Sequence, residues 1–280
     1  MDTSRWLPPA LGLRLAEATD LAPHDARVQG WRAARGLDGP PGILQGGLAV
    51  GVTMEAMRLA SGTDGLPVAV DARLHAPTPL ETDLTAHVDG AGERLEVSLH
   101  DGDQVLVRSK STGIEGAAEA VDDLADLLGA PGPDPRPQQL YPGCFVCGSR
   151  PSHPLGLRIH PAWSDDETIV TGFRPRPELA DHRGVLAPVV VAAALDCPTL
   201  WSAFAAIRRR GDEGGLLAGF RFVSLRNVPI DEELRIVARC DAVDGRKLRT
   251  RGALFDTQGR VLATSSALHI SVAELPGGPR

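Results

Sequence analysis

Two stretches decide how this chain folds: PGILQGGLAVGVTMEAMRLA (Pro41–Ala60) and RGVLAPVVVAAALDCPTLWS (Arg183–Ser202). Both contain Gly-(Ile/Val)-Leu and continue into an apolar run of small residues. Each run carries one acidic residue, Glu55 in the first stretch and Asp196 in the second. A helix that is apolar almost all round must be covered on most of its faces. The two stretches therefore predict a pair of buried helices in similar surroundings.

The segments after the two predicted helices also resemble each other. Pro79 falls opposite Pro229 and Leu84 opposite Leu234, each pair 150 positions apart. Hairpin patterns follow in both halves, with the turns DGDQ and DTQG between strands of alternating polarity. Each half is therefore predicted to be one buried helix followed by an antiparallel meander that wraps around it.

The repeat also sets the expected domain organisation. A length of 280 residues fits one large domain or two smaller ones. The proline-rich stretch APGPDPRP near the middle can neither continue a helix nor join a sheet interior, and it follows a helical pattern of apolar and acidic residues. We expect a first unit with a trailing helix over 1–129, a linker over 130–140 and a second unit over 141–280.

Composition limits the partners. The formal net charge of −7 argues against nucleic acid, because phosphate binding needs a basic face. No apolar run reaches the length of a membrane span, and the first twenty residues lack the pattern of a secretory signal. Four cysteines without an export signal predict free thiols in the cytoplasm. We expect neither nucleic acid nor a membrane as partner.

The segment GCFVCGSRPSHPLGLRIH (143–160) contains a C-x-x-C pair and two histidines. Cys144, Cys147, His153 and His160 offer four ligands to a metal, but the second histidine is distant for a zinc finger and prolines interrupt the stretch. A redox pair and a purely structural turn are the alternatives. Buried free cysteine usually acts as a small hydrophobic residue, which favours the structural role, so no cofactor and no metal is predicted.

The segments CFVCG…HPLGLRI and GVLAPVVVAAALDCP resemble the start of hotdog-fold thioesterases of the phenylacetate-pathway type, and GILQGGLA resembles the matching loop of acyl-CoA thioesterases with two tandem hotdog units. The resemblance implies an α+β double hotdog: two antiparallel sheets, each wrapped around a central helix, joined into one long curved sheet. It implies an acyl-CoA or other acyl thioester as substrate, and a homodimer or larger homo-oligomer.

The resemblance also implies a site. In such enzymes the thioester carbonyl lies at a helix N-terminus, whose N–H groups stabilise the oxyanion, and a carboxylate from the other unit acts as base or nucleophile. In the first predicted pocket Gly47 supplies the N–H beside Gly46, Gln45 orients the carbonyl or water, and Asp196 is the acid.

A second, pseudo-equivalent pocket pairs Glu55 with the loop 182–187, where His182 is a candidate catalytic residue. This loop lacks the glycine pair, and Pro188 removes one N–H, so the second pocket is predicted to be the weaker one.

Two further positions of the tandem enzymes have no clear match. Ser224 or Asn227 stands in for a hydroxyl residue on the strand after the helix, and Ala267 lies where a glutamine is expected on the last strand. Three functions stay open: a thioester hydrolase, a hotdog hydratase or dehydratase using Asp181 and His182, and a non-catalytic acyl-ligand binding protein.

Overall fold

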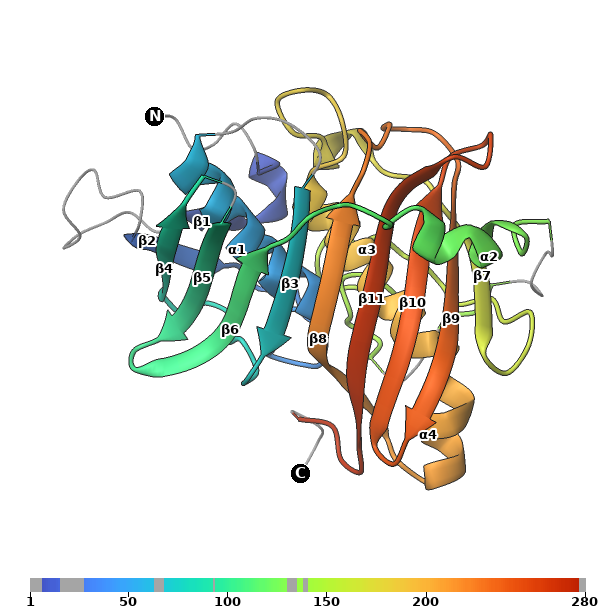
Figure 1. Ribbon diagram of the computed structural model, residues 1–280. Coiled ribbons are helices and arrows are strands. Elements are labelled where there is room, and N and C mark those ends of the chain that lie inside the picture. The colour runs from blue at the N-terminus through green and yellow to red at the C-terminus, as the bar shows by residue number, and fades with distance from the viewer. Residues whose placement is uncertain are drawn as a thin grey trace.

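The computed structural model describes residues 7–15, 28–62, 68–92, 94–129, 135–137 and 141–276. Their strands form one eleven-stranded antiparallel sheet in the order β1-β2-β4-β5-β6-β3-β8-β11-β10-β9-β7 (Figure 1). The bounds are β1 Leu13–Leu15, β2 Val28–Ala33, β3 Val68–Leu74, β4 Leu84–Ala91, β5 Arg94–Asp101, β6 Gln104–Ser111, β7 Thr168–Phe173, β8 Gly214–Ser224, β9 Leu234–Asp244, β10 Lys247–Phe255 and β11 Val261–Val272.

The sheet contains the predicted repeat. The first half has the strand order β2-β4-β5-β6-β3, the second half has the equivalent order β7-β9-β10-β11-β8, and β3 pairs with β8 in the middle. Leu84 begins β4 opposite Trp31, and Leu234 begins β9 opposite Phe173. The correspondence of Leu84 and Leu234 at an offset of 150 residues is therefore confirmed.

The two predicted helices, α1 (Gly46–Ser61) and α3 (Pro188–Ser202), lie side by side on one face of the sheet (Figure 1). They approach so closely that a Cβ atom on Gly47 would lie 2.6 Å from the carbonyl oxygen of Ala192. One turn further along α1, a Cβ on Gly51 would overlap Val189. Small residues at this crossing let the two backbones meet, and the contact directs the N-terminus of α1 at the middle of α3.

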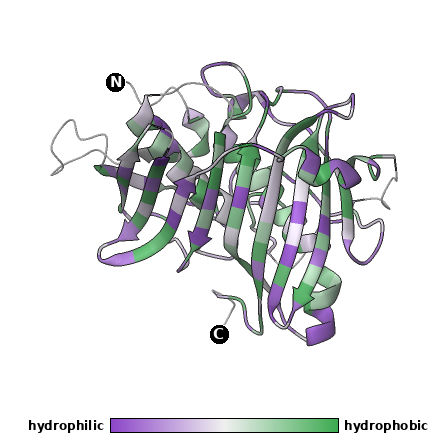
Figure 2. Cartoon of the chain, viewed as in Figure 1, coloured by the Kyte–Doolittle hydropathy of each residue, from purple (hydrophilic) through white to green (hydrophobic). Residues whose placement is uncertain are grey.

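The core lies between this helical layer and the sheet. Every residue of α3 is buried, and α1 is buried from Gly47 to Met57. Hydrophilic and hydrophobic residues alternate along several strands (Figure 2), as expected when only one face of a strand packs on the core. The predicted architecture, two antiparallel sheets around central helices joined into one long sheet, is confirmed.

The segment between the halves crosses to the outer face of the second half. The short helical elements η3 (Glu119–Val121) and α2 (Asp122–Ala125) place Val121 and Leu124 against Val237 and Phe255 of the sheet. Arg251 on β10 holds this segment through a two-pronged contact with Asp123. The predicted trailing helix is therefore short and packs on the second half; of the linker predicted over 130–140, only 135–137 is described.

The segment 141–160 does not lead directly into a strand. Phe145 N donates a hydrogen bond to Asp38 O of the first half. Leu157 N donates a hydrogen bond to Phe145 O, so the segment folds back on itself. The first strand of the second half, β7, begins only at Thr168. After α3 the chain bends into α4 (Phe204–Arg210).

Among the described residues, no single helix is long and apolar enough to span a membrane, and only the pair α3–α4, bent by 48°, has the length and composition when taken together.

Candidate functional site

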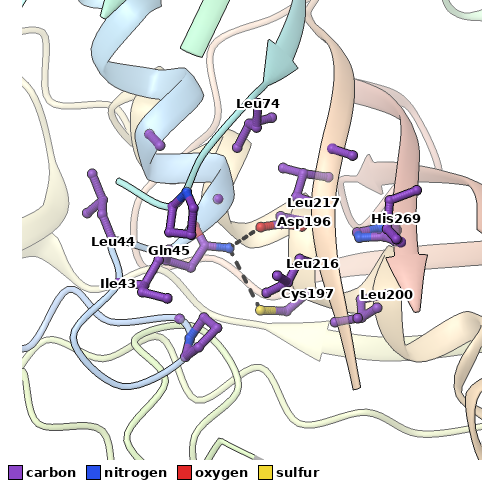
Figure 3. A pocket seen from close by; sticks show the side chains of 18 of the residues that line it. Ile43, Leu44, Gln45, Leu74, Asp196, Cys197, Leu200, Leu216, Leu217 and His269 are labelled. Atoms are coloured by element: carbon purple, nitrogen blue, oxygen red, sulfur yellow. Dashed lines mark hydrogen bonds between the residues drawn. The ribbon is translucent and has the colours of Figure 1, made fainter. Parts of the chain in front are cut away.

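The first predicted pocket is assembled at the N-terminus of α1. Gln45 is the N-cap residue, and its side-chain oxygen accepts from Leu48 N at 2.9 Å. This bond fixes the amide group, whose Nε2 then donates to Asp196 Oδ2 at 2.5 Å. Gly47 N donates to the same oxygen at 3.0 Å. The loop of one half and the acid of the other therefore meet directly (Figure 3).

The surroundings of Asp196 favour its neutral form. The side chain is buried among apolar residues of α3, and this burial raises the pKa of the carboxyl group to about 7. The hydrogen bond from Gly47 acts in the opposite direction and stabilises the carboxylate. The helix N-terminus adds partial positive charge at the same place. Asp196 is thus a carboxyl group able to exchange a proton near neutral pH.

Glycine is required where α1 begins. A Cβ on Gly46 would lie 2.9 Å from Asp196 Oδ2 and 2.9 Å from a methyl carbon of Leu217. Among the described residues the Gly46 N–H has no hydrogen-bond acceptor, and Gly46 lines a cavity. A first-turn N–H points out of the helix end, so Gly46 offers an available donor next to the carboxylate.

The cavity has a volume of about 300 Å³ and extends between the two halves. Ile43, Leu44, Leu74, Leu200 and Leu217 give it a mainly apolar wall (Figure 3). The polar groups on the wall include Gln45, Asp196, three cysteines, Arg246 and His269. An apolar pocket with a few converging polar groups is the usual form of a small-molecule site.

His269 on β11 is a cavity residue that the sequence reasoning missed. Thr199 Oγ1 donates to Asp196 O at 2.6 Å, so in its 3.1 Å contact with His269 Nε2 the imidazole must be the donor. The other ring nitrogen, Nδ1, is buried without a partner in the described part of the chain. Burial lowers the pKa of His269 to about 3, which keeps the ring neutral. Nδ1 is therefore an unprotonated acceptor.

The positions expected for the hydroxyl residue and the glutamine of the tandem enzymes lie elsewhere than predicted. Ser224 and Asn227 do not line the cavity, whose wall on β8 is formed by 215–218. On β11 the lining residues are His269, Ile270 and Val272, and Ala267 is not among them. The ladder between β11 and β8 shifts register between Leu268 and His269, an irregularity that simple alternation does not predict.

The second predicted pocket is organised differently. Glu55 is buried, accepts from Arg58 Nε at 2.7 Å and does not line the cavity. Burial raises the pKa of Glu55, and Arg58 opposes that rise. Asp181 is held by Arg183, and His182 is exposed. The structure thus joins Gln45, Gly46, Gly47 and Asp196, and places Glu55 and His182 outside the cavity.

The cysteines of the C-x-x-C pair also reach the cavity. Cys144 and Cys147 lie next to Cys197, which follows Asp196 on α3, and all three are buried. Gln45 Nε2 lies 3.8 Å from Cys197 Sγ. The predicted histidine partners are engaged differently: His153 Nδ1 accepts from Leu155 N, and neither histidine joins the three sulfurs. Sequence spacing gave no signal for the third cysteine.

Arg246 lines the cavity, where its Nε donates to Ser271 O at 2.9 Å. Arg209 and Arg210 pair with Asp166 and Asp212 on the surface. Arg208 lies over the ring of Phe204.

Solved structures share this architecture. A thioesterase structure from Novosphingobium aromaticivorans aligns with a TM-score of 0.64 at 16% identity, over 90% of this chain and 98% of that chain. The acyl-CoA thioesterase II TesB2 of Mycobacterium marinum aligns with a TM-score of 0.58 at 16% identity, over 97% and 98%. A protein of unknown function with a hotdog fold from Alicyclobacillus acidocaldarius aligns with a TM-score of 0.57 at 16% identity, over 94% and 97%.

No family model and no curated protein sequence matches this chain. The structural alignments cover both halves together, which confirms the double hotdog fold expected from the repeat. At these identities the alignments establish the fold, and the chemistry of the site has to be argued from its own residues.

Proposed function

We propose that this protein hydrolyses an acyl thioester, with acyl-CoA as the substrate class. The observation that carries the proposal is the contact of Asp196 with Gln45 and Gly47 at the wall of an apolar cavity. This contact joins the three elements that the reaction needs: an acid–base group, N–H donors at a helix N-terminus and an apolar space for the acyl chain. The solved structures titled as thioesterases support the same function.

In the proposed mechanism the thioester carbonyl enters beside the first turn of α1. Gly47 was expected to donate to the oxyanion, but its N–H already holds Asp196. We therefore assign the oxyanion to the N–H of Gly46, assisted by Gly47 when the carboxylate moves. An oxyanion donor of this kind is worth roughly 3–4 kcal/mol of transition-state stabilisation. Gln45 keeps Asp196 directed at the carbonyl.

Asp196 then acts as the base for water or as the nucleophile. In the first case it accepts a proton from the attacking water, the C–S bond breaks, and the proton passes to the leaving thiolate. In the second case its oxygen bonds to the acyl carbon, the thiolate leaves, and water cleaves the anhydride. Either route yields a free acid and a free thiol. A pKa near neutrality suits both the acceptance and the return of a proton.

The cavity volume of about 300 Å³ is at the lower end of small-molecule sites. A short or medium acyl chain fits such a space against Ile43, Leu74 and Leu217. Arg246 lies on the cavity wall and is assigned to a phosphate of the coenzyme A part of the substrate.

The test is a panel of acyl-CoA esters of increasing chain length, with the released thiol measured by a thiol reagent. The proposal expects turnover with a maximum at a short or medium chain. A parallel titration with non-hydrolysable acyl-CoA thioethers measures binding alone. Binding without hydrolysis across the whole panel would favour a non-catalytic acyl-ligand binding protein, and neither binding nor hydrolysis would reject the site.

A further inference from the structure

Three cysteines from two distant segments meet beside the cavity. Cys144 and Cys147 lie in the turn that starts the second half, and Cys197 lies on α3, fifty residues beyond Cys147. All three are buried, and their Sγ atoms lie within 4.8 Å of one another. The fourth cysteine, Cys240, is buried on β9 and is not part of this group.

The spacing of the sulfurs fits ligands around a metal ion. Cys144 Sγ and Cys197 Sγ are 3.7 Å apart. Zinc binds thiolate sulfur at about 2.3 Å, so two sulfurs of a tetrahedral site lie about 3.8 Å apart. A disulfide requires about 2.05 Å. Cys144 and Cys197 therefore already stand at the separation of two zinc ligands, the third sulfur lies within 4.8 Å of both, and no pair is at disulfide-bonding distance.

Two N–H donors lie next to the sulfurs. The indole N–H of Trp201 is buried without a hydrogen-bond partner in the described residues, and it lies beside the sulfur of Cys147. Gln45 Nε2 lies 3.8 Å from Cys197 Sγ. Donors of this kind commonly surround metal-bound ligands and orient them.

We propose that Cys144, Cys147 and Cys197 bind one Zn²⁺ ion whose fourth coordination position opens into the cavity beside Asp196. Thiolates select soft metals over magnesium, calcium or manganese. Three protein ligands with one open position is the arrangement of zinc sites that hold a water molecule, and the cavity is lined by all three cysteines. The site stands independently of thioester hydrolysis, because metal binding needs no substrate.

The fourth ligand assigned to this site is a water molecule. Cys197 directly follows Asp196 in α3, so the ion and the carboxylate share one wall of the cavity. The C-x-x-C pair alone favoured a structural role, because two cysteines do not complete a zinc site. The third cysteine, Cys197, comes from the central helix α3 and is distant in the sequence.

The experiment measures metal in the full-length protein, purified without chelator and without added metal, by inductively coupled plasma mass spectrometry. We expect about one zinc per chain, and less than a tenth of that in Cys147→Ser and Cys197→Ser. Cys240→Ser is the matched control, since it removes a buried cysteine outside the cluster, and it should keep the metal.

Stripped wild-type protein titrated with Co²⁺ gives a second readout that does not depend on the variants folding. The cobalt–thiolate charge-transfer bands should rise to saturation at one equivalent, and zinc should abolish them. Protein that contains no zinc, takes up no cobalt and shows four free thiols after denaturation would overturn the proposal. A disulfide between Cys144 and Cys197 in the purified protein would overturn it as well.

Discussion

Asp196 of the second half accepts a hydrogen bond from the backbone N–H of Gly47 in the first half at 3.0 Å. The contact exists because α1 and α3 cross at small residues, which brings the first turn of one helix to the middle of the other. Repeating a unit twice within one chain therefore does more than lengthen the sheet. It places the helix N-terminus of the first half against the acid of the second half, a contact that neither half could make alone.

Replacing Gln45 by methionine removes the side chain that directs Asp196. The lost bond to a carboxylate is worth about 1.5–3 kcal/mol, so kcat for an acyl-CoA should fall roughly tenfold to hundredfold, with little change in KM. Gln29→Met is the matched control, because the Gln29 amide bonds Ala56 O near the other end of α1. An equal loss of kcat in both variants would mean that the effect comes from a less stable helix α1 and not from the position of Asp196.

Gly47→Ala should loosen the crossing of the central helices. Its Cβ would meet backbone atoms of Ala192 and Ala193 at 2.6 and 2.7 Å, and backbone does not move aside as a flexible side chain does. Overpacking of this kind costs about 1–3 kcal/mol, so thermal unfolding should shift down by several degrees. Gly129→Ala, where nothing lies within 4 Å of the added Cβ, should leave Tm unchanged. An unaltered Tm for Gly47→Ala would mean that the helices are further apart than described.

Arg246→Ala tests the assignment of a phosphate to this residue. KM for an acyl-CoA should rise several-fold while kcat stays close to the wild-type value, because the arginine contacts a part of the substrate that does not react. The same variant should process an N-acetylcysteamine thioester, which lacks the phosphates, like the wild type. A KM that rises equally for both substrates would mean that Arg246 supports the shape of the cavity and does not bind a phosphate.

Arg251 holds the short helix α2 against the sheet through Asp123. The effect of Arg251 on the stability of the fold should depend on pH. Its contact lowers the pKa of Asp123 below the ordinary value of 3.8. A carboxyl group with a depressed pKa stabilises the fold above that ordinary value, and the stabilisation is lost as the pH falls through the folded-state pKa. Arg251→Met should therefore have a lower Tm than the wild type at pH 7, and the gap should narrow below about pH 4. A gap that is independent of pH would point to lost packing alone.

The sequence predicts the architecture because the repeat constrains it twice. The helices of 41–60 and 183–202 have the same small-residue pattern, and Leu84 and Leu234 occupy equivalent strand starts. The pairing of Gln45 with Asp196 follows from that symmetry together with the resemblance to tandem enzymes, and the structure places these two residues in contact.

The rest of the site depends on features that have no sequence period. His269 was missed because the position expected on the last strand was Ala267, and a shift in strand register lies next to the histidine. Cys197 joins Cys144 and Cys147 only after the turn 141–148 folds under α3. In the second predicted pocket the acidic residues are taken up by ion pairs with neighbours in sequence, Glu55 with Arg58 and Asp181 with Arg183.

The most direct test of the central claim compares Asp196→Asn with Glu55→Gln in single-turnover hydrolysis of the preferred acyl-CoA, after circular dichroism has shown both to be folded. The account predicts a loss of more than ~100-fold for Asp196→Asn, the usual scale for a positioned acid–base group, and a rate within a few-fold of wild type for Glu55→Gln. Full activity in Asp196→Asn, or a loss confined to Glu55→Gln, would contradict it.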